Sequence, residues 1–128
     1  MLIYEVNLTV DDDVAAAYAG WLSEHIQKVM TIKGFSGAQW FFRVPGEEGL
    51  ENSDKKHWTV HYMVESQEDL DNYLANHAPK IRQEATDLFG GKFTIERRVL
   101  HLLSVAVSPD ELARFQQLAQ QGSEPAKP

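Results

Sequence analysis

The sequence predicts one α+β domain with the element order strand, helix, strand, strand, helix, strand, followed by a further helix near the C-terminal end. Three observations support this fold class. The length of 128 residues and the hydrophobic content of 43% suit a single buried core. Apolar residues alternate along several segments, as they do in half-buried strands. The two longer segments between those strands carry apolar residues at helical spacing.

The first half of the domain begins with a strand over residues 2–10, where every second residue is apolar. Three aspartates at 11–13 offer cap side chains and suit the positive end of a helix dipole. The helix that they start carries one apolar stripe and ends at Lys33 and Gly34. A second strand, rich in aromatic residues, is expected over 35–44. A loop over 45–56 follows, because glycine, proline and polar residues cluster there.

The second half repeats this order with a strand over 57–64, a helix over 66–88 and a strand over 92–103. Ser66 and an aspartate three residues later resemble a capping box at the start of the helix. Pro79 lies inside the helical pattern, where proline removes a backbone donor and clashes with the preceding turn. We therefore expect the helix to kink or split near residue 78.

The C-terminal part is expected to form a helical extension over 104–121. Its start is marked by a cap serine at Ser108, a proline at the first helical position and Glu111 three residues after the cap. Residues 122–128 are expected to be a disordered tail. This leaves 1–103 as the folded domain.

An internal repeat supports the same architecture, since residues 4–10 match 58–64 and residues 21–26 match 73–78. Two matched β-α-β halves are typical of a ferredoxin-like βαββαβ fold with a four-stranded antiparallel sheet. Right-handed connections then place the first and third strands side by side at the centre. Both helices cover one face of the sheet, and the other face is left open.

The open face is predicted to mix apolar and polar groups. Strand alternation assigns these residues to it: Ile3, Glu5, Asn7, Thr9, Gln39, Phe41, Arg43, His57, Thr59, His61 and Met63. Either Arg97 or Arg98 joins them, and the pattern leaves open which one. A mixed face suggests burial against a partner, and a second copy in a homodimer is the simplest one.

Composition excludes several function classes. The net charge of −7 disfavours binding to nucleic acid, because an acidic surface repels phosphate. The chain has no cysteine, which excludes disulfides, thiolate metal sites and a cysteine nucleophile. No apolar run approaches membrane-spanning length, so no membrane partner is expected. The N-terminal residues enter a strand without a basic segment or cleavage site, which predicts a cytoplasmic protein.

Three short motifs resemble a known group. They are the opening Tyr-Glu-Val-Asn-Leu-Thr-Val at 4–10, Gly-Phe-Ser-Gly at 34–37 and Tyr-Leu-x-x-His-Ala-Pro at 73–79. Together with the architecture they resemble domain-of-unknown-function family 4286 over residues 1–103. That family is related to the dimeric α/β-barrels, which include the antibiotic-biosynthesis monooxygenases. The resemblance implies a homodimer with a cavity between the sheet and the helices, and it supplies no established activity.

The same resemblance bears on cofactors. Asn7 falls where haem-degrading relatives place an asparagine on the first strand, and Tyr73 falls near their helical tryptophan. Those relatives also need a haem-ligating histidine, but the corresponding position here is about Gln83, which is a poor iron ligand. No haem and no other cofactor is therefore expected.

Histidines are the other candidates for chemistry. His25 and His77 lie mid-stripe on their helices, and each is either a hydrogen-bonded core histidine or a general base or acid that lines a pocket. His57 and His61 are about 13 Å apart along one strand and cannot share a metal, so no metal site is expected. Glu5 with Arg43, or with one of the later arginines, is expected to form a charge pair or to anchor a carboxylate ligand.

Two functional hypotheses remain open. The first is a non-catalytic or small-molecule-binding homodimer whose cavity is lined by Asn7, His61, Trp21, Tyr73 and His77. The second is a cofactor-independent monooxygenase or isomerase-like enzyme that acts on a small aromatic or carboxylate-bearing substrate. In the second, His77 or His25 serves as base and Asn7 as polarising donor. The sequence leaves open whether the protein is an enzyme.

Overall fold

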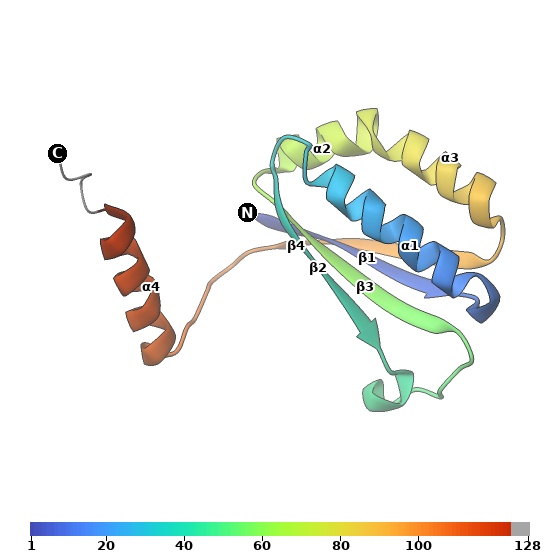
Figure 1. The fold of residues 1–128 in the computed structure, drawn as a ribbon, viewed down its shortest axis with the longest axis horizontal. Helices are drawn as coiled ribbons and strands as arrows, with labels where there is room; N and C mark the ends of the chain where they lie inside the picture. Colours follow the sequence, from blue (N-terminus) through green and yellow to red (C-terminus); the bar gives the residue numbers. More distant parts are fainter. Residues whose placement is uncertain (124–128) are drawn as a thin grey trace.

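A computed structural model describes residues 1–123 and confirms the predicted order of elements (Figure 1). The chain forms strands β1, β2, β3 and β4 and helices α1, α2, α3 and α4, with a short 3-10 helix, η1, between β2 and β3. Their bounds are β1 Leu2–Val10, α1 Asp12–Val29, β2 Phe35–Arg43, η1 Pro45–Glu48, β3 Lys56–Val64, α2 Gln67–Asn76, α3 Ala78–Phe89, β4 Phe93–His101 and α4 Pro109–Ser123.

The sheet is antiparallel and has the strand order β2-β3-β1-β4, so β1 and β3 are central as predicted. Helices α1, α2 and α3 all lie on one side of it, and the other face has no helix over it (Figure 1). The register pairs Val6 with Val60 and Glu5 with His61. Because successive residues point to opposite faces, Val6 faces the helices and Glu5 the open side. This is the ferredoxin-like arrangement.

The core lies between the sheet and the helices. It is built from the helix-facing residues of the central strands and the apolar stripe of α1, as expected from their spacing. Its most deeply buried side chains are Val10, Tyr18, Val29, Val60, Val64 and Leu70. Four of the residues in this layer are tyrosines: Tyr4, Tyr18, Tyr62 and Tyr73.

The helix expected over 66–88 is split into α2 and α3 at His77, next to the predicted position. Pro79 occupies the first turn of α3, where its missing N–H costs no helical hydrogen bond. The serine half of the predicted capping box is present, since Ser66 Oγ accepts from the backbone N–H of Asp69 at 3.2 Å. Ser66 Oγ also donates to Asp69 Oδ2 at 2.9 Å.

The register of β4 resolves the two adjacent arginines. Arg98 is paired with Glu5 and therefore faces the open side, whereas Arg97 is paired with Val6 and faces the helices. The strand ends at His101 rather than at residue 103, and Leu102 adds one hydrogen bond from its N–H to the Met1 carbonyl at 3.2 Å.

The chain beyond β4 leaves the sheet as an extended segment and ends in α4, which stands apart from the sheet and its covering helices (Figure 1). Ser108 Oγ caps α4 by accepting from the Glu111 N–H at 3.1 Å, as predicted. The helix runs to Ser123, two residues further than expected, and the rest of the predicted tail lies outside the described residues. Its apolar side chains, Leu112, Phe115 and Leu118, are exposed.

Candidate functional site

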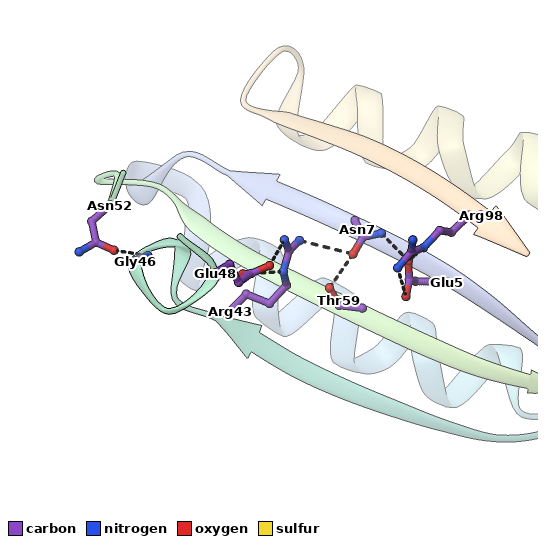
Figure 2. A network of polar contacts seen from close by, with 8 residues as sticks. All are labelled: Glu5, Asn7, Arg43, Gly46, Glu48, Asn52, Thr59 and Arg98. Atoms are coloured by element: carbon purple, nitrogen blue, oxygen red, sulfur yellow. Dashed lines mark hydrogen bonds and ion pairs between the residues drawn. The ribbon is translucent and has the colours of Figure 1, made fainter. Parts of the chain in front are cut away.

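The open face carries a network of polar contacts centred on Glu5 (Figure 2). The Glu5 side chain is buried although it lies on the uncovered side of the sheet. His61 Nε2 lies 2.8 Å from Glu5 Oε1, and Asn7 Nδ2 donates to Glu5 Oε2 at 2.9 Å. Arg98 binds the same carboxylate through Nε, and its Nη2 donates to Oε1 at 3.3 Å. Three neighbouring side chains thus surround one carboxylate.

The network continues from Asn7 to the end of β2 (Figure 2). The Asn7 carbonyl oxygen accepts from Thr59 Oγ1 at 2.6 Å and from Arg43 Nη1 at 3.5 Å. Arg43 also forms a two-pronged pair with Glu48, through Nε at 3.1 Å and Nη2 at 2.7 Å. Glu48 is held in place by η1, where the Gly46 N–H donates to Asn52 Oδ1 at 2.8 Å.

The charges of this network balance one another. The hydrogen bond from Arg98 is the main cause that lowers the pKa of Glu5 to about 2, with further contributions from Asn7 and His61 against the opposing effect of burial. The hydrogen bonds that Arg43 donates to Glu48 lower the pKa of the Glu48 carboxyl. The predicted ligand-binding residues Glu5, Asn7, Arg43 and His61 are therefore brought together, but their polar groups bind one another.

The residues that the structure describes contain no cluster of three histidine or carboxylate side chains placed to hold a metal ion. His57 makes a separate contact of 2.7 Å between Nε2 and Ser53 Oγ.

A second candidate site lies on the other side of the sheet, between the strands and the helices. It is a cavity of about 50 Å³, space for a few water molecules. Most of its wall is apolar, with Val6, Leu8, Leu22, Val60 and Ile95 among the lining residues. Four tyrosines from four different elements also line it: Tyr4 of β1, Tyr18 of α1, Tyr62 of β3 and Tyr73 of α2.

These four tyrosines are at least 95% buried, yet none of their hydroxyl groups makes a hydrogen bond to any residue within 1–123. No fully enclosed polar side-chain atom in that range lacks a partner, so each of these hydroxyl oxygens is accessible to water. Burial raises the pKa of Tyr18 and Tyr73 to about 12, and it raises that of Tyr62 further, helped by the neighbouring phenols. All three therefore remain protonated donors at neutral pH.

His25 and Trp21 form the wall of the cavity on the α1 side. Their rings stack at 5.2 Å with an interplanar angle of 8°, and Trp21 Nε1 donates to Glu84 Oε1 on α3 at 2.9 Å. Burial lowers the pKa of His25 to about 4, so its imidazole is neutral at physiological pH. A wider cleft of about 270 Å³ between α1 and the α2–α3 pair shares Trp21, His25 and Ile81 with the cavity.

The structure divides the predicted site residues between the two faces. Trp21, His25 and Tyr73 line the cavity, and His77 lines only the wider cleft, where its exposed ring stacks on Tyr73 at 6.3 Å. Asn7 and His61 are on the opposite side of the sheet. The expectation of one cavity lined by both groups is therefore wrong, because strand alternation aims Asn7 and His61 away from the helices. His25, His77 and Asn7 do not converge within the chain.

Several cavity residues were missed from the sequence. Tyr4, Tyr18 and Tyr62 fit the apolar periodicity of their strands and helix, Arg82 stands in no predicted site, and Arg97 was one of two candidates for the open face. The sequence does contain a chemical signal for this site. Tyrosine recurs at core-facing positions of neighbouring elements, and unlike leucine or phenylalanine it brings a hydroxyl group that needs a hydrogen-bond partner.

Comparison with known proteins supports the fold. A family model for a domain of unknown function (DUF4286) matches residues 1–103. A search of curated proteins found no match. No helix among residues 1–123 has the length and apolar character needed to span a membrane.

Solved structures with a similar fold include a candidate antibiotic biosynthesis monooxygenase from Deinococcus radiodurans, with 13% identity and a TM-score of 0.64 over 84% of this chain and 97% of that one. SnoaB, a cofactor-independent oxygenase from Streptomyces nogalater, shows 10% identity and a TM-score of 0.60 over 84% and 98% of the two chains. Rv0793 from Mycobacterium tuberculosis shows 16% identity and a TM-score of 0.57 over 84% and 100%. At these identities the likeness concerns the fold alone.

Proposed function

The chain belongs to the DUF4286 family of domains of unknown function, and on that premise we propose that it is a homodimeric protein that binds a small molecule in the tyrosine-lined cavity. The observation that carries the proposal is the set of four buried tyrosines that line one cavity and whose hydroxyl groups have no hydrogen-bond partner within residues 1–123. Each of these hydroxyl oxygens stays accessible to a water-sized molecule, so the cavity presents four phenolic donors that no described residue occupies. A ligand with polar groups can replace the water at these positions.

We predict that Tyr62→Phe separates stability from binding. Removing a hydroxyl that no described residue satisfies should leave the free energy of unfolding unchanged or raise it by up to about 1 kcal/mol. The same change should weaken binding of salicylamide, a neutral one-ring probe, by about fivefold, because one donor to the ligand is lost. Saturation-transfer NMR measures the affinity and urea unfolding the stability.

The matched control is Phe35→Leu. Phe35 packs on Tyr62 and Tyr73 but does not line the cavity. It should lower stability by about 1 kcal/mol and leave the affinity for salicylamide unchanged. Equal affinity in the Tyr62→Phe protein and the unaltered protein would count against the cavity as the binding site.

Support for the homodimer comes from the open face and from the C-terminal segment. Ile3, Met63 and Leu100 form an apolar area at one end of the open face. Phe41 lies further along β2, opposite Thr59 and beside the internally paired network of Glu5, and it is 45% exposed. Leu103 is 97% exposed and Val105 is 72% exposed on the segment that leads to α4. A twofold axis across the open face would bury the same area on both copies, and the internal pairing of the polar groups lowers the cost of removing water from them.

A charge on the open face should dissociate the dimer. Phe41→Asp places a carboxylate within the proposed contact, and each copy would bury one without a partner. Light scattering on the full chain is expected to give twice the chain mass for the unaltered protein and the single chain mass for Phe41→Asp. Phe42→Asp is the control, because Phe42 is paired with Trp58 on the helix side and is 79% exposed. A monomeric unaltered protein, or dissociation only in the control, contradicts the proposed face.

A cofactor-independent oxygenase or isomerase-like enzyme is the second candidate. Such enzymes rely on the reactivity of the substrate and supply positioning, a base and donors. The observation that favours it is His25, a neutral imidazole on the wall of a donor-lined cavity. The oxygenase SnoaB has a similar fold, which makes the comparison relevant without assigning the activity. Oxygen uptake with 1,4-dihydroxynaphthalene that is lost in His25→Ala would favour the enzyme over the binding protein.

A further inference from the structure

We propose that the ligand of this cavity is an anion, a small aromatic carboxylate whose charged group binds at Arg82 and Arg97 while its ring lies among the tyrosines. This inference rests on the proposed function and narrows the class of ligand. Arg82 comes from α3 and Arg97 from β4, and both line the cavity with side chains that reach solvent.

The two guanidinium groups differ from the other arginines of the chain. Arg43, Arg98 and Arg114 each form an ion pair with a glutamate. Arg82 and Arg97 form no ion pair or side-chain hydrogen bond with any residue in the described range. The chain carries 19 acidic against 12 basic residues, so acidic partners are abundant. The two arginines without partners are thus the two that line the same cavity.

The wall of the cavity has a one-sided charge. Its lining residues in the described part of the chain include these two arginines and no aspartate or glutamate. Glu84 is close by, but it lines the wider cleft and accepts the Trp21 indole N–H. In a protein with a net charge of −7, the wall of this cavity is locally positive, whereas the adjoining cleft carries Glu24 and Glu84 beside Lys28.

The positive charges reach the buried phenols. Arg82 and Arg97 both oppose the rise in the pKa of Tyr73 that burial causes, and Arg97 does the same for Tyr18. The hydroxyls inside the cavity are donors, so they suit an acceptor such as a carboxylate or phenolic oxygen. A planar carboxylate also matches the fork of a guanidinium group. The tyrosine hydroxyls, the two arginines and the apolar walls of the cavity together favour a ligand that has an aromatic ring and an acidic group.

The available space limits the size of the ring. The cavity itself has a volume of about 50 Å³, and it borders the cleft of about 270 Å³ through Trp21, His25 and Ile81. The cavity and part of the cleft together have room for an acid with one aromatic ring, and not for a larger ring system.

The test compares two probes of equal size, salicylate and salicylamide, on the full chain. We expect salicylate to bind the unaltered protein at least tenfold more tightly than salicylamide at low salt. Arg82→Gln and Arg97→Gln should each weaken salicylate binding by about tenfold and change salicylamide binding by less than threefold. Lys80→Gln is the control, because it removes a positive charge from the same helix at a residue that does not line the cavity. Arg97→Lys should bind salicylate more tightly than Arg97→Gln does, because it keeps the positive charge. Circular dichroism checks that each variant is folded.

The outcomes separate this inference from the function on which it rests. Two outcomes would overturn the anion site and leave the binding cavity in place. They are equal binding of both probes, and salicylate binding that neither arginine substitution weakens. Either one would mean that the two arginines are ordinary solvated side chains. Binding of neither probe would overturn both. A loss of affinity in Lys80→Gln as large as in the arginine variants would reduce the effect to general surface charge and would also overturn the assignment.

Discussion

Replacing Glu5 by glutamine is expected to lower the free energy of unfolding at neutral pH by about 2–3 kcal/mol. The hydrogen bonds from Arg98, Asn7 and His61 stabilise the ionised form of Glu5, and its pKa falls from 4.5 to about 2. A shift of that size corresponds to about 3 kcal/mol in favour of the folded state when the group is ionised in both states. Glutamine keeps the shape of the side chain and removes the charge.

The same pKa shift fixes the pH range of the effect. Because the pKa of Glu5 is lower in the folded chain, its contribution is complete above the unfolded value of 4.5 and is lost as the pH falls toward 2. The unaltered protein should therefore lose stability steeply in that range, and Glu5→Gln should not. The pKa of His25 falls from 6.5 in the unfolded chain to about 4 in the folded one, so the protein also loses stability as the pH falls between those two values. The Glu5→Gln protein should show this loss as well.

Urea unfolding at a series of pH values measures these differences. Glu48→Gln is the control, since Glu48 forms its pair with Arg43 at the exposed end of the network. It should change stability much less than Glu5→Gln does, because water screens an exposed ion pair. A Glu5→Gln protein with an unchanged acid transition would show that the network contributes nothing to folding.

Replacing Gly34 by alanine is expected to destabilise the fold by about 3 kcal/mol. Gly34 has a φ angle of +89°, which costs about 1–2 kcal/mol for a residue with a Cβ atom. An added Cβ would lie 2.4 Å from Cβ and 2.3 Å from Cγ of Asp69. Asp69 would have to move, and it takes part in the cap of α2 through Ser66. The loss of that cap adds about 1 kcal/mol.

Gly20→Ala provides the opposite result in the same protein. Gly20 lies inside α1, and an added Cβ would meet no atom within 4 Å. Alanine should therefore stabilise the helix by about 1 kcal/mol. Thermal unfolding of both variants checks the pair, and a neutral Gly34→Ala would mean that the corner between α1 and β2 adopts another backbone conformation.

The fold could be predicted from the sequence because its signals are local and repeated. Alternation in β1 and β3 and the stripe of α1 fixed both the element type and the buried face, and the matched halves indicated the order of strands. The split at His77 followed from Pro79, whose ring cannot continue a helix. The end of β4 and the length of α4 were less accurate, since edge strands and helix ends lack a sharp chemical signal.

The candidate site was predicted only in part, because it depends on pairing between distant residues. Membership of Glu5, Asn7, Arg43 and His61 in one face follows from strand alternation, but the closure of their hydrogen bonds does not. The difference between Arg97 and Arg98 needed the register of β4. Apolar periodicity identifies Tyr62 as buried, but whether its hydroxyl finds a partner is a property of the assembled core.

Strand β1 separates the two candidate sites by a single residue step, since Tyr4 and Val6 line the cavity while Glu5 and Asn7 hold the network on the reverse side. Deleting or inserting one residue inside this strand would turn the side chains beyond that point to the opposite face of the sheet, and it would place a carboxylate among the tyrosine hydroxyls. We expect an inserted or deleted residue to be tolerated better between η1 and β3, where the backbone does not present alternate residues to two sites.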